Sequence, residues 1–125
     1  MYYNGKQSGS TGNLGEELTA EFLRKNGFII VKRNWRDRFG EIDVIAENNT
    51  HIIFVEVKTR RENALVGGIT AVDLLKTQRI KRTANEFLKR LQRPLIPRFD
   101  VAEIIVYTRP DKTEGYKLNY IKSAF

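Results

Sequence analysis

The chain has 125 residues, 41% hydrophobic and 30% charged, a balance typical of one soluble globular domain and too apolar for a disordered chain. It contains no cysteine, which excludes disulfides and thiolate metal sites, and it has no apolar run near the roughly 18 residues of a membrane-spanning helix. With 22 Lys and Arg against 15 Asp and Glu, the formal net charge of +7 favours an anionic partner such as nucleic acid.

The first twelve residues are polar and rich in Gly and Ser, and we expect them to form a flexible arm (1–12) before one domain (13–125). They contain no apolar signal segment, so we expect a cytoplasmic protein without membrane contact. A helix should begin at Asn13, which can serve as the N-cap, with Glu16 three residues later as in a capping box. The helix should end at Asn26-Gly27. Its apolar stripe would be Leu18, Phe22 and Leu23.

The rest of the chain alternates between β-rich runs and one long helical pattern. Strands are predicted over residues 28–33, 41–46, 51–58, 99–108 and 116–121, with a basic loop over 34–40. A helix is predicted over about 70–91, with an apolar face of Val72, Leu75, Ile80, Phe87, Leu88 and Leu91. This order of elements predicts an α/β fold with a mixed central sheet flanked by helices.

The strands over 41–46 and 51–58 should form a hairpin that collects charge on one face. If the turn spans residues 47–50, Asp43 pairs with Phe54 and Glu41 with Glu56. Asp43 and Glu56 are then diagonal neighbours, about 7–8 Å apart at the backbone. Alternation puts Glu41, Asp43, Ile45, Ile52, Phe54, Glu56 and Lys58 on one face, and Ile42, Val44, Ala46, Ile53, Val55 and Val57 on the other.

Carboxylates on a partly apolar face should neutralise one another or hold a cation, because unpaired burial of charge costs several kcal/mol. Asp43 and Glu56 offer the hard oxygen ligands that Mg²⁺ or Mn²⁺ prefers, and the backbone carbonyl of Val57 could add another. Lys58 could orient or deprotonate water and stabilise charge on a phosphate. The alternative is a structural Glu–Lys pair near the edge of the sheet.

Basic residues form three groups that suit nucleic-acid phosphates. These groups are Arg36 and Arg38 in the loop, Arg60 and Arg61 after the Glu56 strand, and Lys76, Arg79 and Arg82 at three-residue steps along the long helix. A solvated helix face would also explain the last group. Trp35 could stack on a base, although packing in the core or at its rim is the favoured interpretation. Asp100 opens a strand, and its role stays open.

Several motifs occur in a fixed order: G-N-L-G-E at 12–16, R-N-W-R at 33–36, G-E-I-D-V-I at 40–45 and F-V-E-V-K-T-R at 54–60. Over residues 12–125 the chain resembles the YraN-like (UPF0102) family of small bacterial proteins. That family is grouped with the restriction-endonuclease-like PD-(D/E)xK nuclease superfamily, which includes archaeal Holliday-junction resolvases. The residue before Asp43 is Ile42, where the name of the superfamily has proline.

The resemblance implies a three-layer fold with a metal site formed by Asp43, Glu56 and Lys58. It also implies that Glu16 on the first helix completes the site, whereas helix periodicity alone does not choose between Glu16 and Glu17. The expected function is a Mg²⁺- or Mn²⁺-dependent DNA endonuclease, with branched or junction DNA as one substrate class. The alternatives are a non-catalytic nucleic-acid-binding module and an adaptor for an acidic protein.

Symmetric cutting of a branched substrate favours a homodimer, because two phosphates must be cut. The candidate interface is the apolar edge around Tyr116, Leu118 and Tyr120.

Overall fold

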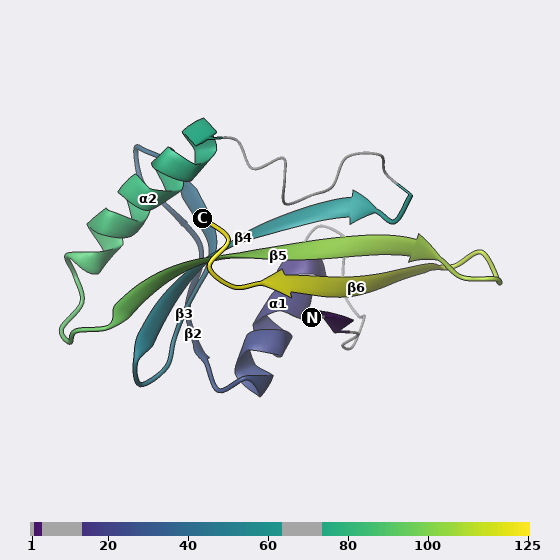
Figure 1. The fold of residues 1–125 in the computed structure, drawn as a ribbon, viewed down its shortest axis with the longest axis horizontal. Helices are drawn as coiled ribbons and strands as arrows, with labels where there is room; N and C mark the ends of the chain where they lie inside the picture. The colour runs from purple at the N-terminus through teal and green to yellow at the C-terminus, as the bar shows by residue number, and fades with distance from the viewer. Residues whose placement is uncertain (1, 4–13, 64–73) are drawn as a thin grey trace.

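The computed structural model describes residues 2–3, 14–63 and 74–125, which form a six-stranded sheet and two helices (Figure 1). The strand order is β1-β6-β5-β4-β3-β2, with β4 and β5 parallel and the other pairs antiparallel. The elements are β1 (Tyr2–Tyr3), α1 (Leu14–Lys25), β2 (Ile29–Arg36), β3 (Glu41–Glu47), β4 (His51–Arg61), α2 (Leu74–Leu88), β5 (Ile96–Thr108) and β6 (Glu114–Ile121).

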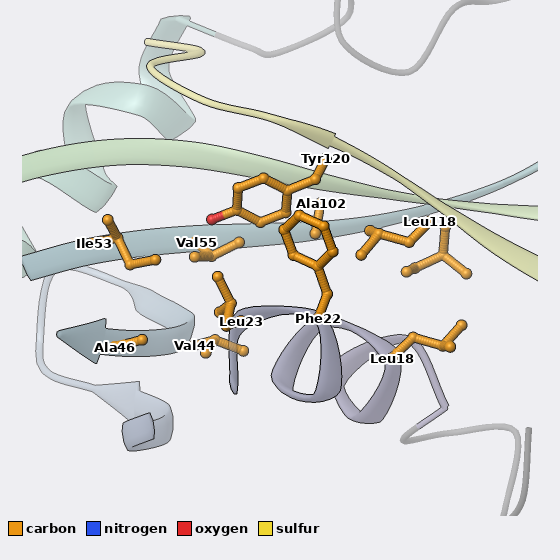
Figure 2. Close-up of a cluster of buried hydrophobic side chains, with 11 residues drawn as sticks. Leu18, Phe22, Leu23, Val44, Ala46, Ile53, Val55, Ala102, Leu118 and Tyr120 are labelled. Atoms are coloured by element: carbon orange, nitrogen blue, oxygen red, sulfur yellow. The ribbon is translucent and has the colours of Figure 1, made fainter. Parts of the chain in front are cut away.

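The two helices cover opposite faces of the sheet, and each covers its own apolar cluster. On the α1 side, Leu18, Phe22 and Leu23 pack against strand residues that include Val55 and Tyr120 (Figure 2). On the α2 side, Ile80, Ala84 and Phe87 pack against Ile42, Ile45, Ile52 and Phe54. Alternate residues of a strand point to opposite faces, so β3 and β4 supply both clusters. The predicted α/β fold with a mixed sheet between helices is confirmed.

Several strands are longer than predicted, among them β4, which ends at Arg61, and β5, which begins at Ile96. Strand β2 continues through Arg36 into the predicted basic loop, because Trp35 packs edge-on against Phe87 of α2, with ring centroids 5.2 Å apart. The favoured packing role of Trp35 is thereby confirmed. Helix α2 ends at Leu88, short of the predicted residue 91, and Leu75 of the predicted apolar face is 59% exposed. Val72 lies outside the described residues.

The predicted register of the β3–β4 hairpin is wrong by two residues. Val44 pairs with Val55 and Glu47 with Ile52, because the Asn48 N–H bonds to the His51 carbonyl and closes a tighter turn than predicted. A two-residue shift keeps every β4 side chain on its predicted face. Continued one step, this register sets Asp43 directly opposite Glu56, and it removes the predicted apposition of Glu41 and Glu56.

The predicted dimer interface around Tyr116, Leu118 and Tyr120 is also wrong, because two of these side chains are buried inside the protein. Leu118 is fully buried and Tyr120 is 5% exposed, both within the α1-side cluster, and Tyr2–Tyr3 pairs with Leu118–Asn119. Of the predicted arm, only this two-residue strand is described, and residues 4–12 lie outside the described residues. Within the described part of the chain, neither helix is long and apolar enough to cross a membrane.

Candidate active-site cleft

Asp43 lies where the regular sheet is interrupted. The β3–β4 pairing stops at Val44 and Val55, and on the other side Asn34 of β2 adopts a left-handed backbone with φ of 53°. Asn is among the non-glycine residues that tolerate this conformation best. At this interruption the Asp43 side chain bonds to the backbone of β4: its Oδ2 accepts the Val57 N–H at 2.8 Å.

The same interruption breaks strand alternation, so Ile42 packs on the α2 side with Ile45. We had expected Ile42 on the opposite face with Val44. Regular alternation requires continuous pairing with both neighbouring strands, and Asp43 lacks it on either side.

The environment of Asp43 favours its neutral form. Burial raises the pKa of Asp43 to about 7. The Val57 N–H opposes this rise by stabilising the charged form, whereas the negative charges of Glu56, Glu16 and Glu41 add to it. Three further carboxylates therefore act on Asp43, which is the excess of negative charge expected of a cation site.

Glu56 is buried, with 5% of the residue accessible, and Lys76 of α2 forms an ion pair with it. The Lys76 side chain is half exposed, and Lys76 lies in the first turn of α2. The ion pair therefore links the start of α2 to β4. Lys76 was predicted as a phosphate contact, but in this structure its ammonium group contacts a site carboxylate.

Glu16 contacts β2 and acts on Asp43 through its charge. Its Oε1 accepts the Asn34 amide at 3.0 Å and an Arg33 guanidinium N–H at 3.3 Å. Glu17 is half exposed and bonds Arg33 at 2.6 Å. Glu16 is therefore the α1 glutamate whose field reaches Asp43. Lys58 lies on β4 two residues after Glu56, on the same face by alternation, and is partly exposed.

An open cleft of about 460 Å³ adjoins the carboxylates. It lies between the β2–β3 loop, the sheet and α2, and its walls are Phe39, Gly40, Glu41, Asp43, Glu56, Lys76, Arg79 and Ile80. Arg79 is exposed and makes no ion pair with a described carboxylate. The cleft therefore combines acidic groups at its base with a free guanidinium at its rim, an arrangement suited to a phosphate ester.

Asp43 and Glu56 offer the hard carboxylate oxygens that a divalent cation prefers. Burial raises the pKa of Asp43, and the negative charges of Glu56, Glu16 and Glu41 add to this rise, while Lys76 is ion-paired with Glu56. Among residues 14–63 and 74–125, no three Asp, Glu or His side chains lie close enough together to hold an ion. Asp43 and Glu56 are therefore the pair on which a cation would depend, while Glu16 is engaged by Arg33 and Asn34.

Three predicted phosphate-binding arginines are engaged by carboxylates. Arg36 pairs with Glu41 at 2.8 Å, and its side chain is 72% exposed. Arg60 bonds the buried Glu103 at 3.0 Å, and Arg61 pairs with Glu114. None of these three lines the cleft. The structure thus separates them from Arg79, which does.

Asp100, whose role the sequence left open, is a structural group. It is fully buried, and its carboxylate accepts bonds from Arg98, the Tyr120 hydroxyl at 2.6 Å and the Ser123 N–H at 2.9 Å. These bonds fix the end of the chain against β5. All of its partners are supplied by the protein, so Asp100 has no part in the cleft.

The β2–β3 loop contains the features that sequence reasoning missed. Asp37 Oδ1 accepts the Phe39 and Gly40 N–H groups at 2.8 and 3.1 Å and the Thr83 hydroxyl of α2 at 2.9 Å. Burial favours the neutral carboxyl, but these three bonds and the charge of Arg38 outweigh it and lower the pKa of Asp37. The loop is thereby bonded to α2, and an acid followed two residues later by an aromatic in a basic loop was its only sequence signal.

Known proteins resemble the chain at two levels. A crystal structure of a repair endonuclease from Pyrococcus abyssi matches with a TM-score of 0.45 and 19% identity, covering 82% of this chain and 40% of that chain. A UPF0102 protein of Caldicellulosiruptor saccharolyticus is 41% identical over 115 residues, covering 91% of this chain and 95% of that protein. One from Dictyoglomus turgidum is 42% identical over the same shares. The model of the uncharacterised protein family UPF0102 matches residues 15–104, and the chain therefore belongs to that family.

Proposed function

We propose that this protein is a divalent-metal-dependent DNA endonuclease that hydrolyses phosphodiester bonds in the Asp43–Glu56 cleft. The observation that carries the proposal is the cleft itself: two adjacent carboxylates at its base, with Lys76 and Arg79 in its walls. The net charge of +7 and the family resemblance to nucleases support the choice of DNA as the substrate.

Asp43 and Glu56 would hold Mg²⁺ or Mn²⁺, with the Val57 carbonyl as a further ligand. Glu16 would act on the ion through its charge, because Arg33 and Asn34 engage its carboxylate. When bound, such an ion polarises the phosphate and lowers the pKa of the attacking water. Arg79 would bind a non-bridging phosphate oxygen from the rim, and Lys58 would stabilise charge that develops in the transition state. Lys76 would leave Glu56 for the phosphate, because its ammonium group lies between that carboxylate and solvent.

A non-catalytic nucleic-acid-binding module is the second candidate, and a specific contact favours it. The Lys76–Glu56 pair already neutralises the buried glutamate without any cation. A protein that retained the fold for binding alone would keep such a pair, since Glu56 would otherwise be a buried uncompensated charge.

Cleavage of a panel of labelled linear, flapped, forked and four-way-junction DNAs in Mg²⁺ or Mn²⁺ separates the two candidates. We expect metal-dependent cutting by the wild type, and a loss of about 100-fold or more for Glu56→Gln and Lys58→Ala. Glu21→Gln, which removes a partly exposed carboxylate on α1 that is paired with Lys25, is the matched control and should cut normally. Salt-sensitive binding without cutting of any substrate would identify the binding module instead.

A further inference from the structure

The loop residue Phe39 is in contact with two arginines that come from different elements. Arg38 precedes it in the loop and Arg82 is on α2, and their guanidinium carbons lie 4.9 and 5.1 Å from the centroid of the Phe39 ring. A guanidinium over an aromatic face is attracted by the ring quadrupole and loses rotational freedom. The ring thus contacts two positive groups, one from the loop and one from α2.

Neither arginine is held in an ion pair, although the charge of Arg38 acts on the nearby Asp37 carboxylate. Within residues 14–63 and 74–125, Arg38 and Arg82 make no ion pair with a carboxylate, and both are exposed. By contrast, Arg33, Arg36, Arg60, Arg61, Arg93 and Arg98 each have a carboxylate partner. Two exposed guanidinium groups on one ring, neither of them in an ion pair, form a site for an anion from outside.

The support beneath this pair is rigid. The Asp37 carboxylate joins the backbone of the loop to Thr83, the neighbour of Arg82, and Thr83 is fully buried. The loop arginine and the helix arginine are therefore fixed to one another by a hydrogen-bonded link as well as by the ring. Little side-chain entropy remains to be lost when an anion binds.

The position of Phe39 connects the pair to the carboxylates. Phe39 belongs to the wall of the cleft that contains Asp43 and Glu56, and also to a second groove of about 590 Å³ lined by Arg82, Asn85, Glu86, Leu88 and Lys89. Glu86, the one acid of that groove, is paired with Lys89 at 3.0 Å. Both hollows are lined by α2 and share Phe39, and the α2 residues 76 to 88 span about 18 Å.

We propose that Arg38, Phe39 and Arg82, the Phe39 clamp, bind the phosphodiester backbone of DNA next to the cleft. Each guanidinium binds phosphate oxygens on the strand that leaves the cleft, and Phe39 positions both. The α2 span that lines the two hollows corresponds to about five nucleotides of a strand at 3.4 Å each. The clamp deepens the proposed function by adding a substrate-binding site, and it rests on that function for the choice of DNA.

The test is the affinity for a fluorescent 16-base-pair duplex in EDTA, measured by anisotropy between 50 and 200 mM salt, where no cutting can occur. Phe39→Leu changes no charge, yet it should weaken binding roughly three- to tenfold, because both guanidinium groups lose the ring. Arg38→Ala/Arg82→Ala should reduce the salt slope by about two phosphate contacts. In that double variant, Phe39→Leu should have no further effect.

Arg24→Ala/Lys25→Ala removes the same charge from α1, on the opposite face of the sheet, and is the control. Unchanged affinity of Phe39→Leu, or an equal loss in the α1 control, would overturn the clamp. Should Phe39→Leu lower the melting temperature, the two double variants still decide between the clamp and nonspecific charge. Binding is measured without metal, so absence of cleavage in the wild type would remove the proposed nuclease without removing the clamp.

Discussion

At the residue scale, Asp43 is the group whose environment opposes folding most clearly. Burial raises its pKa to about 7, so the charged form is held in a place that favours the neutral form. A residue kept in such a place at the expense of stability is typical of functional sites. Substitution of Asp43 should therefore change the stability of the protein as well as its activity.

In metal-free protein, Asp43→Asn should raise stability at alkaline pH. The folded pKa of about 7 exceeds the ordinary value of 3.8, so the folded protein binds the extra proton and loses stability as the pH rises between these values. The full difference corresponds to up to about 4 kcal/mol. Urea unfolding in EDTA should show the variant more stable by about 2–4 kcal/mol at pH 8 and little different at pH 4. An advantage that is equal at both pH values would contradict the assignment.

Removal of Lys76 should expose how much Glu56 depends on it. Lys76→Ala leaves a buried carboxylate without its cation, and the free energy of unfolding should fall by about 1–3 kcal/mol. In a Glu56→Gln background the same change should cost much less. Lys89→Ala breaks the exposed pair with Glu86 and is the matched control, with an expected effect below about 0.5 kcal/mol. Equal losses with and without Glu56 would show that the pair contributes nothing.

At the scale of elements, the site depends on how closely α1 lies against the sheet. A Cβ at Gly15 would stand 3.0 Å from Ile104 Cγ1 and 3.2 Å from Val57 Cγ1. Ile104 is buried, so it has little room to move. The absence of a side chain at residue 15 thus permits the approach that brings Glu16 to Asn34 and within electrostatic reach of Asp43.

Gly15→Ala should lower the free energy of unfolding by about 1–2 kcal/mol, because the overpacking outweighs the better helix propensity of alanine. Thermal and urea unfolding measure the change. Gly40→Ala is the control: its Cβ would meet Thr83 and Arg79 atoms at 3.5 and 3.6 Å, which is ordinary contact, and stability should stay within about 0.5 kcal/mol. A Gly15→Ala protein as stable as the wild type would show that α1 can shift outward freely.

Sequence patterns predicted the elements well where the patterns are local. Alternation in β4 placed Glu56 on the α2 side and Val55 on the α1 side, since that strand is paired regularly on β5 along its length. The hairpin register failed because the Asn48 turn is tighter than a count of turn-forming residues suggests. The predicted face of Ile42 was wrong because the left-handed Asn34 interrupts the neighbouring strand. A conformation of this kind leaves no periodic pattern in the sequence.

Contacts between elements that are distant in the sequence could not be predicted from it. Lys76 was recognised as basic, but its pairing with Glu56 depends on where α2 begins relative to β4. In the sequence Phe39 follows Arg38, but its contact with Arg82 requires the loop to lie against α2. The Asp37–Thr83 bond joins the loop to that helix. These contacts depend on the crossing of α2 over the sheet, which residue spacing alone does not predict.

At the scale of the whole molecule, the two faces of the sheet have different tasks. The α1 face holds a closed apolar cluster (Figure 2), whereas the α2 face combines an apolar cluster with the carboxylate cleft and the Phe39 clamp. Many of the other arginines are paired with acids. Arg38, Arg79 and Arg82, which are exposed and form no ion pair among the described residues, lie on α2 and on the loop that is bonded to it.

The most direct test of the central claim is the rate of DNA cleavage in Mn²⁺ by wild type and Asp43→Asn, purified in parallel and checked for folding in the same samples. The account predicts that the wild type cuts and that Asp43→Asn, although more stable at pH 8, loses cutting by about 100-fold or more. Cutting by Asp43→Asn at the wild-type rate would contradict the assignment of the cleft as the catalytic site.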